Sequence, residues 1–263
     1  MASPEPARVQ SCLRGEARLF GGCSPGATVV ELPGVLAGVA PAAAERSLFN
    51  AVIYEQGADL LAAWPTLDRM YAEAGVRAWT VWLNLDDGAT SSALEQRGHK
   101  LDGRPVGMWA AIQDMSLVAE AGLEWSSEPD FASLGSINDA SYTLGLPAFG
   151  AVLGAPREAG AGARTYVARL GTRAVCCLVT HDEPDGTLGV SAVATLPEAR
   201  GQGLASRLLS VALREAKARG LTHTALVASS AGRGVYARLG YHDCGIRELW
   251  EKREADSKPD PPL

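Results

Sequence analysis

The stretch "ATLPEARGQGLASRLL", residues 194–209, joins an apolar run to a helical pattern. Gly201, Gly203 and Ala205 are small, an arginine precedes them, and apolar residues then recur at helical spacing. The first N–H groups of a helix lack internal partners and carry partial positive charge, so such a turn can hold a pyrophosphate. Glycines also occur in plain strand-to-helix turns, and the stretch alone leaves both interpretations open.

The preceding residues distinguish this stretch from two other phosphate-binding motifs. Two strands are predicted over 165–170 and 173–180, joined by a turn at Gly171, and a third strand over 188–195. Strands joined by a hairpin are antiparallel, whereas a dinucleotide-binding motif opens a parallel βαβ unit. A P-loop needs a Gly-Lys-Ser/Thr sequence, which the stretch lacks.

The pattern Arg-x-x-Gly-x-Ala at residues 200–205 resembles the acyl-CoA signature of the Gcn5-related N-acetyltransferase (GNAT) superfamily. "VYARLGY" at 235–241 resembles the second landmark of that superfamily and follows after one predicted helix and one predicted strand. The resemblance covers residues 123–251 well. It implies a mixed, mostly antiparallel sheet flanked by helices, acetyl-CoA as co-substrate without a metal, and direct transfer of the acetyl group to an amine.

The resemblance also implies where acetyl-CoA is held. The strand before the motif would bend away at a bulge, and the backbone of Val193, Ala194 and Thr195 would pair with the pantetheine arm. A backbone N–H near Val193 would stabilise the charge on the thioester oxygen. The pyrophosphate would lie on the amides of Arg200, Gly201, Gln202, Gly203, Leu204, Ala205 and Ser206.

Proton transfer is assigned to Tyr236, which matches the residue that protonates the leaving thiolate in the superfamily. The alternative is that Tyr236 is only a half-buried aromatic residue, and Tyr241 is expected in the core. Ser229 stands where many members carry an Asn that touches pantetheine. The resemblance therefore places Ser229 among the cofactor-binding residues, although a serine departs from the family pattern.

No general base is identified from the sequence. Glu198 and His181 have suitable chemistry, but Glu198 falls in an exposed turn and His181 at a strand end. Buried strand cysteines are usually inert, so direct transfer is favoured over an acyl-cysteine route through Cys176 or Cys177.

The first half of the chain resembles the second. Residues 72–109 and 216–250 both run from a helix end through a glycine, a strand, a short helix and a further strand to a tryptophan. We therefore predict an α+β fold with two GNAT-like units, each a mixed, mostly antiparallel sheet flanked by helices. The predicted boundaries are a degenerate unit over 1–115, a linker over 116–127, an acetyltransferase domain over 128–253 and a disordered tail over 254–263.

The first unit is expected to bind no coenzyme A. It lacks the Arg-x-x-Gly-x-Ala pattern, Asp59 stands where phosphates need positive charge, and Leu94 stands at the position of Tyr236. Trp79 and Trp82 face opposite sides of one strand, so either both pack against helices or one of them lines the acceptor cleft.

Composition restricts the class of protein. The 263 residues carry a net charge of −6, which disfavours a nucleic-acid groove. No apolar run is long enough to cross a bilayer, the first residues do not resemble a signal peptide, and membrane association is not expected. The odd number of cysteines (Cys12, Cys23, Cys176, Cys177 and Cys244) indicates reduced thiols and a cytoplasmic protein.

The leading hypothesis is an acetyl-CoA-dependent N-acetyltransferase with one active unit. The alternative is a non-catalytic acyl-CoA-binding regulatory module, and a third interpretation makes the glycines purely architectural. The acceptor is either a small-molecule amine or a protein amine, and the acidic charge balance favours a cationic one.

Overall fold

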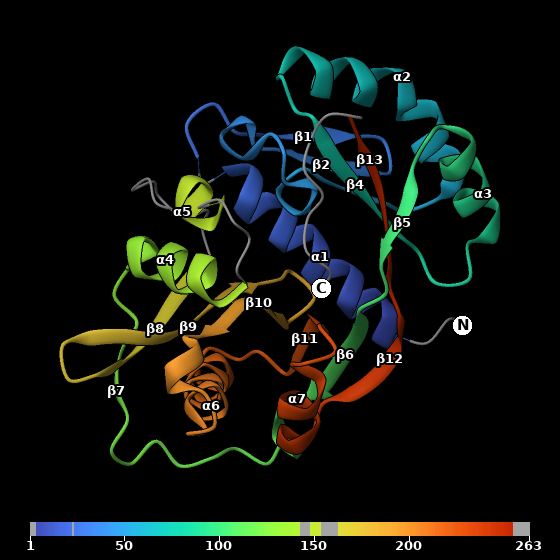
Figure 1. Ribbon diagram of the computed structural model, residues 1–263. Helices are drawn as coiled ribbons and strands as arrows, with labels where there is room; N and C mark the ends of the chain where they lie inside the picture. The colour runs from blue at the N-terminus through green and yellow to red at the C-terminus, as the bar shows by residue number, and fades with distance from the viewer. Residues whose placement is uncertain (1–3, 23, 143–147, 154–162, 255–263) are drawn as a thin grey trace.

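The computed structural model describes residues 4–22, 24–142, 148–153 and 163–254. Two sheets lie on either side of a long helix, α1 (Pro4–Gly22), which runs between them (Figure 1). This mixed architecture confirms the predicted α+β fold.

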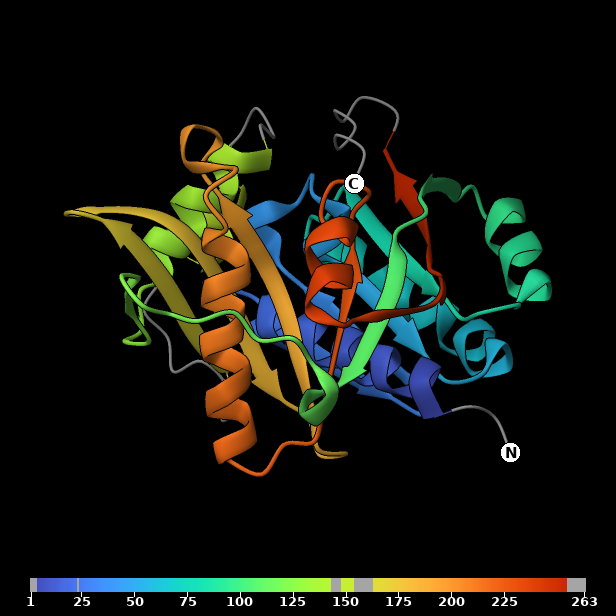
Figure 2. The same ribbon diagram turned by 90° about the horizontal axis from the view of Figure 1, so that it is seen from below.

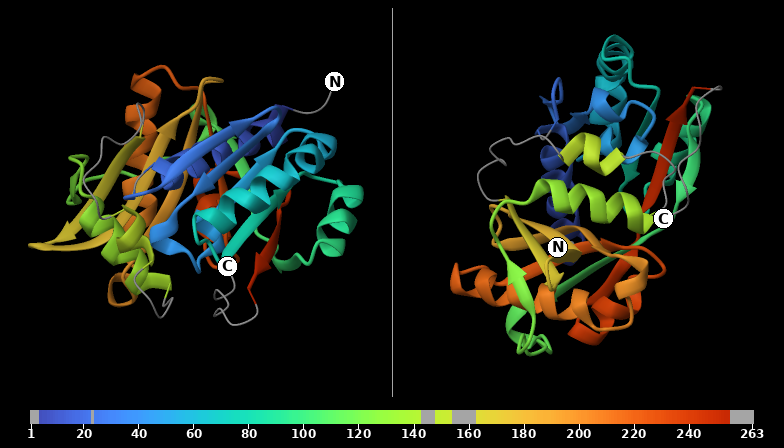
Figure 3. Two further views of the ribbon diagram at one scale, coloured as in Figure 1. Left: turned by 90° about the horizontal axis from the view of Figure 1, so that it is seen from above. Right: turned by 60° about the vertical axis from the view of Figure 1, so that its left-hand side comes forward.

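The first sheet has six strands in the order β1-β2-β3-β4-β13-β5, and the β3–β4 pair is parallel while the other pairs are antiparallel. Its strands are β1 (Thr28–Leu32), β2 (Val35–Val39), β3 (Ala51–Tyr54), β4 (Ala78–Leu83), β5 (Lys100–Gly103) and β13 (Glu248–Arg253). Helices α2 (Gly57–Glu73) and α3 (Gly88–Gln96) pack against this sheet on the side away from α1 (Figure 3).

The second sheet has seven strands in the order β12-β6-β11-β10-β9-β8-β7. Its strands are β6 (Val106–Ala111), β7 (Glu124–Ser126), β8 (Ala163–Leu170), β9 (Arg173–Asp182), β10 (Thr187–Thr195), β11 (His223–Ala228) and β12 (His242–Ile246). Helices α6 (Leu204–Ala218) and α7 (Arg233–Leu239) cover one face, while α1 and α4 (Phe131–Tyr142) cover the other (Figure 2). Helix α5 (Ala148–Leu153) packs on α4, and short 3-10 turns are η1 (Pro41–Ala43), η2 (Ser47–Phe49), η3 (Ile112–Asp114) and η4 (Pro197–Ala199).

The two sheets exchange strands. β6 comes from the first half of the chain but pairs with β11 and β12 of the second sheet. β13 comes from the C-terminal end but pairs with β4 and β5 of the first sheet, as the red and green arrows of Figure 1 show. The predicted units 1–115 and 128–253 are therefore tied together by backbone hydrogen bonds, and neither half of the chain forms its sheet alone.

Helix α1 was not predicted from the sequence. Pro4 and Pro6 fall in its first turn, where proline is tolerated. Val9, Cys12, Leu13 and Ala17 form a buried stripe along it. They contact Leu36, Ile53 and Trp82 of the first sheet and Ala225 of the second. The helix therefore forms a core that both sheets share.

Much of the predicted secondary structure of the second half is confirmed. The hairpin turns at Gly171, whose φ is +58°, and α6 ends before Gly220, whose φ is +92°. The predicted helix over 128–142 is α4, and Tyr241 is buried in the core as expected. The predicted tail after residue 254, most of the loop over 157–164 and Cys23 lie outside the described residues.

Within the described residues, no helix is long and apolar enough to cross a membrane. Cys12, Cys176 and Cys177 are buried, Cys244 is half-buried, and none of these four forms a disulfide.

Candidate active site

A bulge interrupts β10, as the family resemblance implies. The pairing of β10 with β9 changes register between Ser191 and Ala194, and Ala192 takes a φ of +49°. Such a conformation is strained for a residue with a Cβ. β10 pairs with β11 only over Thr187–Gly189, so the two strands separate beyond that point. The bulge thus opens a gap in the middle of the second sheet.

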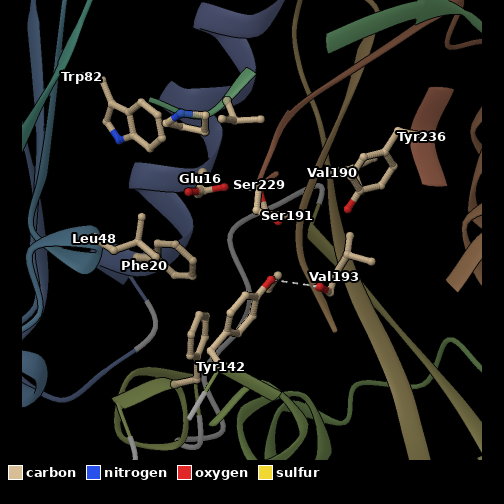
Figure 4. Close-up of a pocket in the computed structure, with 14 residues that line it drawn as sticks. Glu16, Phe20, Leu48, Trp82, Tyr142, Val190, Ser191, Val193, Ser229 and Tyr236 are labelled. Carbon is tan, nitrogen blue, oxygen red and sulfur yellow. Dashed lines mark hydrogen bonds between the residues drawn. The ribbon is translucent and has the colours of Figure 1, made fainter. Parts of the chain in front are cut away.

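A cavity of about 140 Å³ adjoins this gap, between the two halves of the chain (Figure 4). The first half contributes Glu16, Phe20, Leu48, Trp82 and Pro105. The second half contributes the bulged segment of β10 together with Tyr142, Phe149, Val227, Ser229 and Tyr236. Of the two tryptophans on β4, Trp82 lines this cleft, whereas Trp79 packs in the core under α2.

Tyr236 extends from α7 into the cleft from the side opposite Trp82 (Figure 4). Tyr236 is 8% exposed, and its ring lies edge-to-face with that of Tyr241, with ring centroids 5.8 Å apart. Burial raises the pKa of Tyr236 well above its ordinary value, so the phenol keeps its proton at neutral pH. The side chain is therefore in the form that a proton donor requires.

The predicted pantetheine-binding strand is present, and parts of its backbone already have partners. The carbonyl of Val193 accepts a hydrogen bond from the Tyr142 hydroxyl at 3.1 Å. Ala194 pairs with Cys177 of β9. The hydroxyl of Thr195 donates to Cys176 Sγ at 3.2 Å, and its carbonyl accepts from Arg200 Nε.

The glycine turn joins β10 to α6 with left-handed backbone at two positions. Gly201 and Gly203 have φ values of +78° and +69°, and a Cβ built on either would meet no atom within 4 Å. Helix α6 begins at Leu204, and within the described chain no side chain caps its first turn. These N–H groups and the open space before them fit a pyrophosphate.

Two predicted ligands of acetyl-CoA are engaged within the chain. The Arg200 guanidinium donates to the carbonyls of Thr195 and Ser141 at 3.1 and 3.0 Å, so it ties the turn to the end of α4. The Ser229 hydroxyl lines the cleft and accepts a hydrogen bond from the Gly232 N–H at 3.2 Å.

Sequence reasoning missed a chain of polar groups that begins at Glu16. Ser191 Oγ donates to Glu16 Oε2 at 2.6 Å and lies 3.3 Å from His181 Nε2. His181 Nδ1 lies 2.7 Å from Glu183 Oε1. The spacing of Val9, Cys12, Leu13 and Ala17 would have revealed the helix that carries Glu16.

The other residues considered as base or nucleophile lie away from the cleft or are inert. Glu198 is exposed and pairs with Arg173. Burial raises the pKa of Cys176 to about 11, which leaves little thiolate at neutral pH. Among the described residues, no three His, Cys, Asp or Glu side chains are placed to hold a metal ion.

In the first half of the chain, a side chain bridges β3 and β4, the strands that correspond to β10 and β11. The Asn84 side-chain amide donates to the carbonyls of Tyr54 and Glu55 at 3.3 and 3.1 Å, so it bridges the ends of β3 and β4. Leu94, at the position of Tyr236, is buried in the core. Asp59 lies in the first turn of α2. These features support the expectation that only the second half binds coenzyme A.

Comparison with protein families identifies the second half of the chain. Residues 161–243 match the family described as "Acetyltransferase (GNAT) domain". This segment contains both the glycine turn and Tyr236. The bulged strand β10 and the turn before α6 both lie within the matched segment.

Solved structures share the fold over nearly the whole chain. A GCN5-related N-acetyltransferase from Kribbella flavida is 15% identical, with a TM-score of 0.66 over 94% of this chain and 96% of that one. A GCN5-related N-acetyltransferase from Sphaerobacter thermophilus is 15% identical, with a TM-score of 0.55 over 99% and 96%.

The two-unit arrangement also has a solved counterpart. A tandem GNAT protein from the clavulanic acid biosynthesis pathway is 12% identical, with a TM-score of 0.50 over 98% of both chains. A search of curated proteins gave no match. The shared feature is thus the tandem fold.

Proposed function

We propose that the protein is an acetyl-CoA-dependent N-acetyltransferase that moves an acetyl group directly to an amine, with one active unit per chain. The observation that carries this proposal is the gap beside β10, whose bulged segment lines the cleft that holds Tyr236 and whose C-terminal end leads into the glycine turn at 200–206. When bound, acetyl-CoA would supply an activated acetyl thioester.

The roles of the chain's own residues follow from their places in this gap. The amides from Arg200 to Ser206 would hold the pyrophosphate, since the first turn of α6 has no side-chain cap. Val193, Ala194 and Thr195 would hold the pantetheine arm, with Ser229 beside it. Tyr142 fixes the carbonyl of Val193 and so orients the bulged segment.

Tyr236 would donate its proton to the sulfur as the thiolate leaves. Its buried phenol is protonated at neutral pH and faces the cleft. A positioned proton donor typically contributes about 10²–10⁴ in rate. A backbone N–H near Val193 would stabilise the thioester oxygen, an effect of about 10²–10³.

The alternative is a non-catalytic module that binds acyl-CoA and regulates another process. The same turn and strand would serve both functions, whereas Tyr236 and the cleft between the halves favour the enzyme. The cellular compartment is proposed to be the cytoplasm on the basis of the reduced cysteines.

The test has two steps. Calorimetry with acetyl-CoA comes first, and no binding at about 1 mM would exclude both the enzyme and the regulatory module. Incubation with a panel of amines and mass spectrometry of the products comes second. Acetylated amine supports the enzyme, and binding without any acetylated product favours the regulatory module.

A further inference from the structure

One carboxylate enters the cleft from outside the GNAT domain. Glu16 lies on α1, and among the described residues that line the cleft it is the one with an acidic or basic side chain. Figure 4 shows its carboxylate directed toward Ser191 at the bulge of β10. A single carboxylate among apolar and aromatic side chains is complementary to a single cationic group.

Glu16 is the open end of a hydrogen-bonded chain that continues into the protein. The Ser191 hydroxyl lies between Glu16 Oε2 and His181 Nε2, at 2.6 and 3.3 Å. A carboxylate oxygen accepts hydrogen bonds, so the contact with Glu183 at 2.7 Å favours the tautomer of His181 with its hydrogen on Nδ1. His181 Nε2 is then an acceptor that faces the Ser191 hydroxyl.

The imidazole occupies a space that two glycines leave for it. A Cβ on Gly15 would lie 2.4 Å from His181 Nδ1 and 2.0 Å from Glu183 Oε1. A Cβ on Gly189 would lie 1.9 Å from His181 Cε1. His181 and Glu183 are 6% and 7% exposed, so this pair reaches the cleft through Ser191.

We infer that Glu16 binds the acceptor amine as an ammonium ion and takes its proton, and that Ser191 passes this proton to His181. An N–H bond of the ammonium breaks and an O–H bond forms on Glu16. Once Glu16 carries this proton, the Ser191 hydroxyl turns from Glu16 toward His181 Nε2. Glu16 then donates its proton to Ser191 Oγ while the Ser191 hydrogen moves to His181 Nε2. Glu16 ends ionised, the amine ends neutral and nucleophilic, and the imidazolium is paired with Glu183. The inference rests on the proposed function, and His181 and Glu183 are positioning residues within it.

The charged and titratable groups around Glu16 are compatible with this role. His181 lies behind Ser191, Cys12 is on the same helix, and Tyr142 approaches from α4. Burial raises the pKa of Glu16, and the hydrogen bond from Ser191 and the nearby His181 partly oppose that rise. A carboxylate with a raised pKa is a stronger proton acceptor than an exposed one.

The walls of the cleft indicate the class of amine. Phe20, Leu48, Trp82 and Phe149 provide apolar surface around the carboxylate, in a cavity of about 140 Å³. Phe149 also stacks on Tyr142, with ring centroids 5.8 Å apart. We therefore expect a small primary amine with a compact apolar body, rather than a polycation.

The experiment compares Glu16→Gln with wild type, using 2-phenylethylamine as the amine and Glu31→Gln as the control. Glu31 lies on β1 and pairs with Arg18 of α1, so the control removes a carboxylate that contacts the same helix at the surface. Calorimetry of amine binding without acetyl-CoA should show at least a tenfold loss for Glu16→Gln. Binding of the neutral analogue 2-phenylethanol should change less than threefold.

Kinetics provide the second readout. Glu16→Gln should lower the acetylation rate by about 10²–10⁴ with unchanged acetyl-CoA affinity. The decrease in kcat/KM that wild type shows at low pH should be absent in Glu16→Gln. Glu183→Gln should lower kcat and leave 2-phenylethylamine binding unchanged, because the imidazolium loses its carboxylate partner, and a purely structural residue would change only the melting temperature.

The outcomes separate the two claims. If wild type binds acetyl-CoA but acetylates no amine, the proposed function is refuted. The amine affinities of wild type and Glu16→Gln then still show whether Glu16 binds the ammonium ion. Equal binding of 2-phenylethylamine to wild type and Glu16→Gln would overturn this inference. So would an acetylation rate in Glu16→Gln within threefold of wild type.

Discussion

A series of substitutions at Gly203 tests the phosphate cradle quantitatively. The φ of Gly203 is +69°, and a Cβ there meets no atom within 4 Å, so a side chain is strained but does not clash. Gly203→Ala, Gly203→Gln and Gly203→Glu should each lower the free energy of unfolding by about 1–2 kcal/mol. Urea unfolding measures this shared cost.

The same series isolates the charge. A carboxylate about 6 Å from two phosphate charges in water costs about 0.7 kcal/mol for each, or about 1.4 kcal/mol in total. Gly203→Glu should therefore bind acetyl-CoA about tenfold more weakly than Gly203→Gln, which has the same size. In calorimetry this difference should shrink at about 1 M salt. Equal affinities of the two variants at low salt would refute the reasoning.

Three further predictions concern single side chains. Tyr236→Phe should lower kcat by about 10²–10⁴ in steady-state assays and leave acetyl-CoA affinity nearly unchanged; an unaltered kcat would remove the acid role. Because burial raises the pKa of Cys176 to about 11, iodoacetamide should alkylate it slowly in the native protein at pH 8 and rapidly after unfolding, as peptide mass spectrometry would show. Burial lowers the pKa of His99 to about 3 against about 6.5 in the unfolded chain, so protonation of the unfolded state should remove about 2 kcal/mol of stability between pH 7 and pH 5. Urea unfolding at the two pH values should show that His99→Phe loses about 2 kcal/mol less stability than wild type on going from pH 7 to pH 5. An equal loss in both proteins would contradict the lowered pKa of His99.

The local signals in the sequence predicted the second half well. Gly171 takes the positive φ that its hairpin turn requires, and α6 ends before Gly220. These features depend on a few neighbouring residues, so sequence patterns carry them. The bulge at Ala192 was predicted through the family resemblance, because the residues around it do not themselves indicate one.

The arrangement between the halves could not be predicted in the same way. The alternation of β6 and β13 indicates strands, but it does not indicate which sheet each strand joins. Glu16 gains its place in the cleft because α1 packs between both sheets. A polar residue on an amphipathic helix looks like a surface residue until its neighbours are known.

The most direct measurement for the central claim is the stoichiometry of acetyl-CoA binding by calorimetry. The glycine turn and the gap beside β10 occur in the second half, whereas Asn84 bridges the corresponding strands of the first. We predict one acetyl-CoA per chain, bound more weakly by Gly203→Glu and with unchanged affinity by Asp59→Asn. Two molecules per chain, or none, would contradict the account.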